Sequence, residues 1–425
     1  MRFERLEVGG DPVAAAAAVR ALAPAPASVS EAVAQIVGAV REGGDRALRE
    51  LVARFDTGGA PRAGGNESLR VDRAELDPAL LHDDVRAGLE IAIANVALVA
   101  DAAIGDDVEV NLPQGHRVVL REVPVRRAAI CVPGRQAAYP STVVMGVVTA
   151  RAAGVEEVVV LTAPPIDPVM LGACALCGVD EVYAMSGAQG VAALAYGTET
   201  IERVDVIAGP GSLFVQEAKR QVSDVVGIDG FYGPSDVLVL ADASADPDLI
   251  AYDLLAQGEH GPHAPVVVVS DAPALLLAVT ESLRTLGVGR EHSEPAAFAL
   301  VHAQTLREAL AFSEAFAPEH LELVGPAVER LAPRVRSAGC VFVGASGATA
   351  FGDYVAGSNH CLPTGGAARF ASGLSPRAFR RRMSEVHIGD AAPALAAAGA
   401  PIARAEGFSV HAESMQARVG ENAPS

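Results

Sequence analysis

Helical and strand-like spacings of apolar residues occupy successive parts of this 425-residue chain. Over residues 30–55, apolar side chains recur about every 3.6 positions, which predicts helix. Gly43–Asp45 interrupts this pattern, so two helices are expected there. A further helical pattern covers Leu80–Ala103. We therefore predict that residues 1–104 form a helical N-terminal segment.

From Val108 onward, short apolar runs that are typical of strands alternate with helical stretches. The predicted strands are Val108–Leu112, Val118–Val123, Ala128–Val132, Val158–Leu161, Glu181–Met185, Val204–Ala208, Asp236–Leu240, Val266–Val269, Phe298–Val301 and Val341–Val343. The predicted helices are Ser141–Ala153, Pro165–Cys177, Ala188–Ala195, Pro247–Gln257, Pro273–Leu286, Leu306–Phe316 and Ala327–Ser337. Largely apolar strands that alternate with helices indicate parallel sheets covered on both faces.

This rhythm occurs twice, which predicts an α/β fold with two consecutive Rossmann-like parallel-sheet units. We expect the first α/β domain over residues 105–235 and the second over residues 236–372. After Gly373 the chain turns basic with a helical pattern at Pro376–Arg382, and Ala391–Arg404 is also predicted to be helical. Residues 373–425 are predicted to form a helical arm that either contacts a partner subunit or caps its own domain.

The composition narrows the possible partners and the compartment. A formal net charge of −19, from 33 basic and 52 acidic residues, argues against a nucleic-acid backbone or an anionic membrane as a partner. Five cysteines, an odd and sparse set, suggest reduced thiols and a cytoplasmic location. The N-terminus lacks the apolar core of a signal peptide, and no apolar run reaches the roughly 18 residues of a spanning helix.

Three loops that contain glycine follow predicted strands of the first unit. They are Pro133–Arg135, Ser186–Gln189 and Gly209–Ser212. A glycine turn at the carboxyl end of a parallel strand lets backbone N–H groups approach an anionic ligand. Each loop alone could equally be a tight turn, but three on one sheet edge indicate a ligand crevice.

A group of polar residues at Ala256–Pro262 stands out from its apolar surroundings. Gln257 and His260 are three residues apart near the end of a predicted helix and so project from one face. With Asp353 and His411 they would offer oxygen and imidazole donors that suit Zn²⁺ or a similar divalent ion. The alternative is that His260 is a hydrogen-bonded structural residue.

Two further stretches carry groups that could transfer protons or bind a ligand. Glu319 and His320 are adjacent, so they could share proton transfers, or they could be a solvated pair that caps Leu321–Val324. The Gly352–His360 loop holds Asp353, Asn359 and His360, and this gathering of polar side chains indicates that it forms part of a site.

These motifs resemble the histidinol dehydrogenase family, and the resemblance covers nearly the whole chain. The segments that match in order and spacing are Val37–Asp56, Glu181–Glu199, Asp205–Val222, Gly233–Ser235, Gln257–Gly261, Glu319–His320, Gly352–His360 and Glu406–His411. The resemblance implies an enzyme of histidine biosynthesis that oxidises L-histidinol to L-histidine. It implies two NAD-dependent steps, a bound aldehyde and one zinc ion.

The resemblance also implies a role for individual residues. His320 would take the alcohol proton and Glu319 would activate the water that adds to the aldehyde. The implied zinc ligands are Gln257, His260, Asp353 and His411; the substrate-binding residues are Ser235, His360 and Glu406; and the cofactor-binding residues are Cys131, Gln189 and Ser212. The family is an intertwined homodimer, which would place Glu406 and His411 in the partner's pocket.

Departures from the family pattern cluster in the cofactor loops. The chain has Cys131 where the family usually has tyrosine, Arg135 where it has glycine and Ser212 where it has asparagine. Gly230–Tyr232 replaces smaller residues. Two other hypotheses follow: a related enzyme that oxidises a different polar primary alcohol, and a metal-binding protein that has lost turnover.

Overall fold

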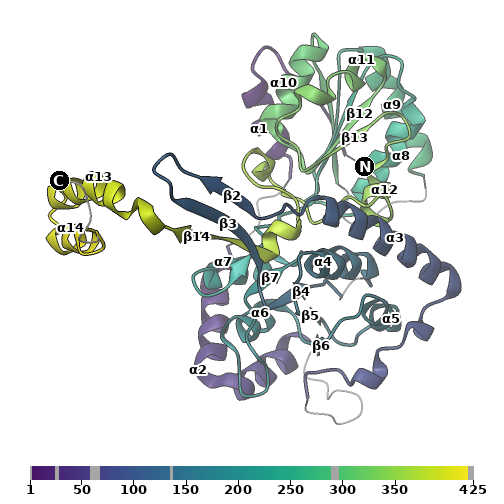
Figure 1. Ribbon diagram of the computed structural model, residues 1–425. Helices are drawn as coiled ribbons and strands as arrows, with labels where there is room; N and C mark the ends of the chain where they lie inside the picture. The colour runs from purple at the N-terminus through teal and green to yellow at the C-terminus, as the bar shows by residue number, and fades with distance from the viewer. Residues whose placement is uncertain (1, 24–27, 58–67, 135–136, 289–295, 420–425) are drawn as a thin grey trace. The chain divides into compact units, whose positions relative to one another are not determined.

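The computed structural model describes residues 2–23, 28–57, 68–134, 137–288 and 296–419. The chain divides into two compact units. The first comprises Met1–Ala103 and Val125–Phe379, and the second comprises Ile104–Pro124 and Arg380–Ser425. Two parallel sheets with their helices make up the first unit, and an antiparallel sheet with a helix pair makes up the second (Figure 1).

The first sheet of the larger unit has five parallel strands in the order β6-β5-β4-β7-β8. The strands are β4 (Arg127–Cys131), β5 (Glu157–Thr162), β6 (Glu181–Ala184), β7 (Val206–Ala208) and β8 (Gly227–Ile228). Its helices are α2 (Ser30–Phe55), α3 (Asp83–Ala102), α4 (Pro140–Ala152), α5 (Pro168–Leu176), α6 (Gly187–Tyr196) and α7 (Leu213–Val222). The short helices η1 (Arg73–Glu75) and η2 (Pro78–Leu80) precede α3.

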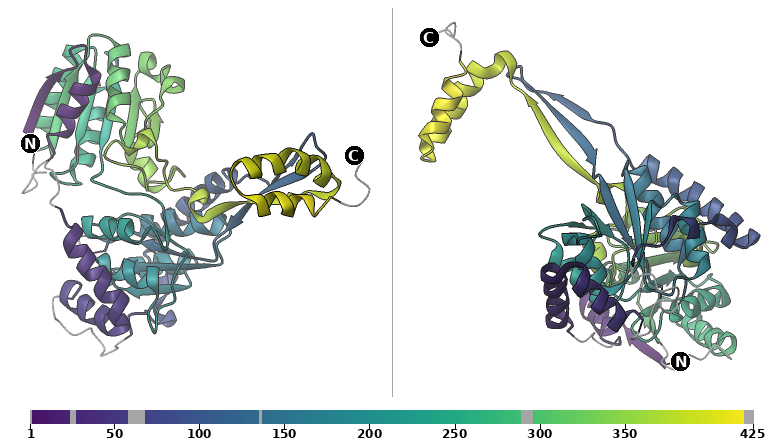
Figure 2. Two further views of the ribbon diagram at one scale, coloured as in Figure 1. Left: turned by 90° about the vertical axis from the view of Figure 1, so that its left-hand side faces the viewer. Right: turned by 90° about the horizontal axis from the view of Figure 1, so that it is seen from below.

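The second sheet has six parallel strands in the order β1-β11-β10-β9-β12-β13, with β1 at the edge (Figure 2, left). The strands are β1 (Arg2–Glu7), β9 (Val237–Ala241), β10 (Val266–Ser270), β11 (Ala297–His302), β12 (His320–Val324) and β13 (Cys340–Val343). Its helices are α1 (Pro12–Arg20), α8 (Pro247–Gly258), α9 (Pro273–Leu286), α10 (Leu306–Phe316), α11 (Pro326–Glu329) and α12 (Thr349–Tyr354). Three short helices, η3 (Ala332–Arg334), η4 (Ala367–Arg369) and η5 (Pro376–Phe379), complete the unit.

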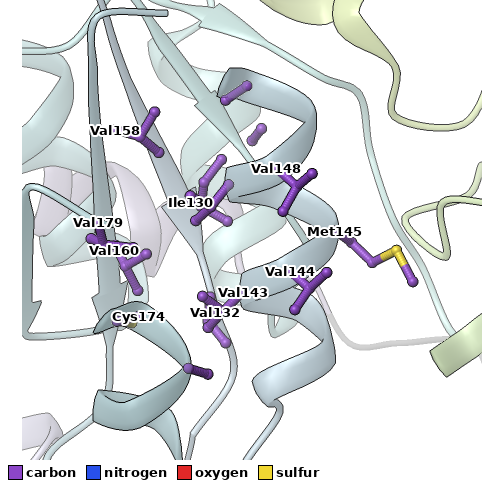
Figure 3. Packing of buried hydrophobic residues seen from close by; sticks show 14 of the residues in the cluster. Ile130, Val132, Val143, Val144, Met145, Val148, Val158, Val160, Cys174 and Val179 are labelled. Carbon is purple, nitrogen blue, oxygen red and sulfur yellow. The ribbon is translucent and has the colours of Figure 1, made fainter. Parts of the chain in front are cut away.

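Each parallel sheet is buried on both faces, which explains its almost wholly apolar strands. On the first sheet, one core packs β4 and β5 against α3, α4 and α5, and the other packs the sheet against α2, α6 and α7. Figure 3 shows Ile130, Val160 and Val144 meeting in the first of these cores. On the second sheet, α1 and α10 cover one face, and α8 and α9 cover the other.

The second unit is built from an antiparallel sheet of order β14-β3-β2 and two helices. Its elements are β2 (Val108–Asn111), β3 (Arg117–Pro124), β14 (Arg380–His387), η6 (Gly389–Ala391), α13 (Ala392–Ala405) and α14 (Ser409–Gln416). The helices α13 and α14 pack side by side through a small core of Ala400, Ala403 and Ala412.

The predicted α/β fold with two consecutive parallel-sheet units is confirmed. The interruption at Gly43–Asp45 is also present, because Gly44 takes non-helical angles (φ 52°, ψ −140°) within α2. The helix predicted at Pro376–Arg382 is wrong: after the short η5, the basic residues form β14 and pair with β3. The strands β1 and β12 were not predicted, since charged residues interrupt their apolar runs. Among the described residues, no helix is long and apolar enough to cross a membrane.

The buried faces of the first sheet predict the effect of removing one large core side chain. Ile130 is fully buried on β4, so Ile130→Ala should lower the free energy of unfolding by about 2–5 kcal/mol. Urea denaturation followed by circular dichroism measures this change. Val13→Ala is the control, because Val13 is 70% exposed and its truncation should have little effect. Equal effects of the two substitutions would contradict this packing.

Candidate active site

A pocket of about 700 Å³ in the first unit gathers residues from both parallel sheets. Nine of the residues singled out from the sequence line it: Cys131, Gln189, Ser212, Ser235, His260, Glu319, His320, Asp353 and His360. Gln257 lies just behind the lining, where its amide Nε2 donates to Ser235 Oγ at 3.0 Å. Glu406 and His411 are exposed residues of the second unit.

The two sheets present opposite edges to this pocket. On the first sheet the lining residues follow strand ends: Cys131 ends β4, Ser186 follows β6 and Pro210–Ser212 follows β7. On the second sheet they lie at strand starts, since Ser235 comes two residues before β9 and His320 is the first residue of β12. The carboxyl edge of the first sheet, with its glycine-containing turns, therefore faces one end of the pocket. The amino edge of the second sheet, with its polar side chains, faces the other end.

Glu319 is held rigidly at that amino edge. Ala317 adopts a left-handed conformation (φ 49°) after α10, and the turn brings Glu319 beside the start of β9. The Glu319 carboxylate Oε2 accepts hydrogen bonds from Ser235 Oγ at 2.6 Å and from the Asp236 N–H at 2.9 Å. In return the Glu319 N–H donates to Asp236 Oδ1 at 2.7 Å. These contacts fix one carboxylate oxygen of Glu319.

Burial decides the protonation behaviour of Glu319. The side chain is only 5% exposed, and this burial raises the pKa of Glu319 from 4.5 to about 7. The neighbouring Asp236 carboxylate raises that pKa further, while His320 opposes the shift. A carboxyl group with a pKa near neutrality can both accept and release a proton at physiological pH.

The hydrogen bonds of His320 select its tautomer. Its Nδ1 lies 3.1 Å from the carbonyl oxygen of Asp236, which can only accept, so Nδ1 carries the hydrogen. The neutral ring therefore has an unprotonated Nε2, which lies 3.7 Å from Asp353 Oδ1. His320 Nδ1 is also 3.6 Å from Glu319 Oε2. The pair thus combines a buried carboxyl group with an imidazole nitrogen that is free to accept a proton.

His360 is held in the same way, but its second nitrogen is already used. Its Nδ1 lies 2.9 Å from the carbonyl oxygen of Asp353 and must be the donor there. Its Nε2 then accepts from Thr142 Oγ1 at 3.1 Å. Burial lowers the pKa of His360, which favours this neutral form. His360 is consequently suited to shape the pocket and contact a ligand.

The predicted metal ligands are only partly brought together. His260 and Asp353 line the pocket, and the amide oxygen of Gln257 stays available because the amide nitrogen is bonded to Ser235. Among the described residues, no group of three or more His, Cys, Asp and Glu could by itself hold a metal ion. An amide oxygen, an imidazole and a carboxylate are nevertheless donors that zinc accepts, so this set fits the ion if a further ligand is supplied.

The carboxyl edge of the first sheet is stabilised by a buried ion pair. Lys219 and Asp229 form a short ion pair with both side chains fully buried. Asp229 accepts the Gly209 N–H at 2.6 Å, and Lys219 Nζ donates to the Gly209 carbonyl at 3.1 Å. Gly209 has φ +103°, and a Cβ there would lie 2.4 Å from the carbonyl oxygen of Cys131. The network therefore fixes a close backbone approach at the pocket wall.

The residues that depart from the family pattern lie at this end as well. Cys131 is buried, and burial raises the pKa of its thiol to about 12, so the thiol stays protonated. Tyr232 is buried, lines the pocket and donates its hydroxyl hydrogen to Asp229 at 3.0 Å. Ser212 is exposed at the start of α7. Arg135 lies outside the described residues.

Several residues that the sequence did not single out also shape the pocket. Asp236 is fully buried and pairs with Arg20 at 3.3 Å, and Thr142 positions His360. Asp56, at the end of α2, accepts from Ser186 and from Gln189 Nε2 at 3.1 Å. Of these residues, only Asp236 could have been suspected from the sequence, because it directly follows the predicted site residue Ser235. Arg20, Thr142 and Asp56 belong to helical patterns that predict packing.

Glycine turns at one sheet edge and a buried carboxyl–imidazole pair at the other suit an oxidoreductase of the dehydrogenase class, and the comparisons with known proteins identify this class. The sequence profile described as histidinol dehydrogenase matches residues 22–419. Histidinol dehydrogenase of Haloarcula marismortui is 40% identical over 405 residues, covering 92% of this chain and 94% of that protein. The Rhodospirillum rubrum enzyme is 41% identical over 405 residues, covering 92% of each.

The fold comparison agrees. The crystal structure of histidinol dehydrogenase from Elizabethkingia anophelis superimposes with a TM-score of 0.88 at 26% identity and covers 98% of each chain. The chain belongs to the histidinol dehydrogenase family, NAD-dependent oxidoreductases of histidine biosynthesis that act on a CH–OH group.

The raised pKa of Glu319 predicts how folding stability depends on pH. Between the unfolded pKa of 4.5 and the folded value of about 7, the folded protein retains a proton that the unfolded chain releases. Stability is therefore lost as pH rises through this window, by up to about 3 kcal/mol. Glu319→Gln cannot lose a proton, so it should gain stability relative to wild type between pH 5 and pH 8.

Urea denaturation of both proteins at several pH values measures this difference. The comparison at pH 5 is the internal reference, because both side chains are then neutral in the folded protein. A difference that does not change between pH 5 and pH 8 would show that Glu319 is not protonated near neutrality.

Proposed function

We propose that the protein oxidises L-histidinol to L-histidine through a bound aldehyde, reducing two NAD⁺ per histidinol. The balance is one alcohol, one water and two NAD⁺ giving one carboxylate, two NADH and three protons. The observation that supports this most directly is the free Nε2 of His320 beside a buried Glu319 whose pKa is about 7. An alcohol-to-acid oxidation needs one group for the alcohol proton and one for the water proton.

His320 and Glu319 act in separate proton transfers. His320 accepts the alcohol proton at Nε2, since its other nitrogen is engaged with the Asp236 carbonyl. Glu319 accepts a proton from the water that adds to the aldehyde carbon, using the carboxylate oxygen that Ser235 and Asp236 leave free. The burial of both side chains keeps bulk water from competing for these protons.

Gln257, His260 and Asp353, with His411, would hold one zinc ion. The ion would orient the imidazole and amine of histidinol in the pocket. Ser235 and His360 line the wall where the substrate would lie, and Glu406 carries a carboxylate that suits its ammonium group. Cys131, Gln189 and Ser212 would border the NAD⁺ at the opposite sheet edge.

The proposal includes a homodimer. Glu406 and His411 are exposed on the second unit of the chain, and neither can contribute to catalysis unless it meets a pocket. We infer that they enter the pocket of a second copy of this chain. We also place the enzyme in the cytoplasm, in keeping with five cysteines that are all unpaired.

A second candidate is the oxidation of another polar primary alcohol. It is favoured by Tyr232, a large buried side chain that lines the pocket where the family pattern has a small one. A phenol ring there changes the space next to Cys131 and Cys361, and hence the shape of the ligand that fits.

The first test follows NADH absorbance with purified protein, L-histidinol and NAD⁺. We expect two NADH per histidinol, loss of turnover after treatment with a chelator, and recovery on adding zinc. His320→Gln should lower kcat by about 10²–10⁴-fold, because an amide cannot replace the proton acceptor. The matched control is His302→Gln, on the same sheet outside the pocket, which should leave kcat unchanged.

A panel of amino and sulfonated primary alcohols runs in the same assay. Turnover of another alcohol without turnover of histidinol would replace the first proposal by the second. The absence of turnover with every alcohol, in protein loaded with zinc, would contradict both.

The placement of His411 in a partner's pocket predicts complementation between two inactive variants. We expect Glu319→Gln and His411→Ala each to abolish activity as homodimers. Co-expressed with different affinity tags and purified through both, the mixed dimer should recover about half of wild-type activity, because one of its two pockets is intact. If each arm served its own chain, both pockets would carry a defect and the mixed dimer would stay inactive.

A further inference from the structure

Two acidic side chains meet beneath the amino edge of the second sheet. Along β12, Leu321 and Leu323 belong to the core under α1 and α10, whereas Val324 belongs to the core under α8. Because side chains alternate along a strand, His320 and Glu322 point to the α8 face. There the carboxyl group of Glu322 lies close to that of Asp253 of α8, and the two groups interact.

Glu322 also binds the start of α12. Its Oε1 accepts the Thr349 N–H at 3.0 Å and the Thr349 hydroxyl at 2.8 Å. Thr349 is the first residue of α12, and α12 lies beside α8. One carboxyl group, 1% exposed, thus connects β12 to two helices.

The hydrogen bonding of the pair requires a proton. Glu322 Oε2 is buried and has no donor among the described residues when both carboxyl groups are ionised. Two carboxylates cannot hydrogen-bond to each other, but a carboxylic acid can donate to a carboxylate. Burial raises the pKa of both groups, and each stays protonated more readily than an exposed acid.

Among the residues that the structure describes, no cation is paired with these carboxyl groups to favour the doubly ionised state. Asp253 faces Glu322 from α8, Val239 of β9 and Phe342 of β13 pair with it in the sheet, and α12 contributes Thr349. Within the described part of the chain, no arginine, lysine or histidine forms an ion pair with either carboxyl group. The other titratable groups on these elements are Asp248 and Tyr252 of α8, His320 of β12, Cys340 of β13, and Asp353 and Tyr354 of α12.

Asp253, Glu322 and Thr349 each lie one helical turn, or two strand positions, from a site residue. Gln257 follows Asp253 by four residues on α8, which is about one helical turn, and Asp353 follows Thr349 by the same spacing on α12. His320 precedes Glu322 by two residues on the same face of β12. A change in the contact between Asp253, Glu322 and Thr349 would therefore shift all three.

We propose that Asp253 and Glu322 share one proton and act as positioning residues, which hold α8 and α12 at the spacing that Gln257, His260 and Asp353 need to bind one metal ion. This inference rests on the metal site of the proposed function. Groups behind metal ligands typically change metal affinity about 10–100-fold when they are replaced.

The test compares Glu322→Gln with Glu322→Leu in the full chain. Glutamine has an N–H where the shared proton lies, so E322Q keeps the donation to Asp253 and the contact with Thr349. Leucine has similar volume but cannot hydrogen-bond. The probe is Co²⁺, whose visible absorption reports its ligands and whose affinity can be titrated without substrate.

We expect E322Q to bind Co²⁺ with wild-type affinity and spectrum, and E322L to bind it about 10–100-fold more weakly with an altered spectrum. In the NADH assay, E322L should have a lower kcat but an unchanged KM for NAD⁺, because the proposed NAD⁺ site lies on the first sheet and Glu322 on the second. Asp242→Leu is the matched control: Asp242 is also a buried carboxylate, at the carboxyl edge of the same sheet, where it accepts from Ala327 N–H. D242L should reduce thermal stability without changing Co²⁺ affinity.

Three outcomes would overturn the inference: unchanged Co²⁺ binding in E322L, equal loss in E322Q and E322L, or no Co²⁺ binding by the wild type. If E322L does not fold, Asp253→Ala removes the contact between Asp253 and Glu322 by changing the half-buried residue on α8. Its Co²⁺ affinity and spectrum are then compared with those of E322Q. Failure of wild-type protein to oxidise histidinol, with Co²⁺ binding lost in E322L, would instead reject the proposed substrate and retain the positioning pair.

Discussion

The polar end of the pocket depends on one buried carboxylate, that of Asp236. Burial raises the pKa of Asp236, so its charge has to be compensated locally. Arg20 of α1 supplies a cation at 3.3 Å, and the same guanidinium stacks on Phe316, the last residue of α10. The Glu319 N–H supplies a further donor. The Glu319 N–H bonds to the Asp236 carboxylate, and His320 Nδ1 bonds to the Asp236 main-chain carbonyl. The position of the acid–base pair therefore follows from that of Asp236.

The site therefore depends on residues that are far apart in sequence but in contact in space. Arg20 and Asp236 are 216 residues apart in sequence. Arg20 nevertheless ends α1, which packs on the second sheet, and Asp236 comes just before β9 of that sheet. Removing the positive partner of a buried charge typically costs several kcal/mol, so α1 is tied to the site as strongly as to the core. The N-terminal strand β1 extends the same sheet and anchors α1 beside it.

The sequence reveals those features that are governed by local spacing. Apolar runs identify most of the parallel strands, since a strand buried on both faces must be apolar. They fail for β12, where His320 and Glu322 place polar groups on a buried face, and for β1, where edge exposure allows alternate charged residues. The arginines of β14 suggest helix, but they lie on an exposed strand whose pairing is set by β3.

The same limit applies to the site. Gln257 with His260 and Glu319 with His320 are local pairs, which a reader of the sequence can find. The resemblance to the family grouped them with Asp353 and His360. The structure places His260, Glu319, His320, Asp353 and His360 in one pocket, with Gln257 bonded to the lining residue Ser235. The hydrogen bonds from Gln257 to Ser235 and from Thr142 to His360 join distant positions whose residue types are common in any chain. No local pattern distinguishes such pairs, so tertiary structure is needed to find them.

The opposite sheet edges explain why one pocket could accept two ligands of opposite charge. At the carboxyl edge of the first sheet, Ser186 and Ser212 are the N-cap residues of α6 and α7, and a helix N-terminus carries a partial positive charge that suits phosphate. Within the described residues, neither helix has an acidic side chain in its first turn to occupy that charge.

At the amino edge of the second sheet the polarity is reversed. There α8 ends at Gly258, and the partial negative charge of its C-terminus faces the turn that carries His260. Its last turn, wholly within the described residues, holds no basic side chain, so that charge is left to attract a cation. The backbone dipoles alone would therefore favour a cation at this end of the pocket and an anion at the other, before any side chain selects a ligand.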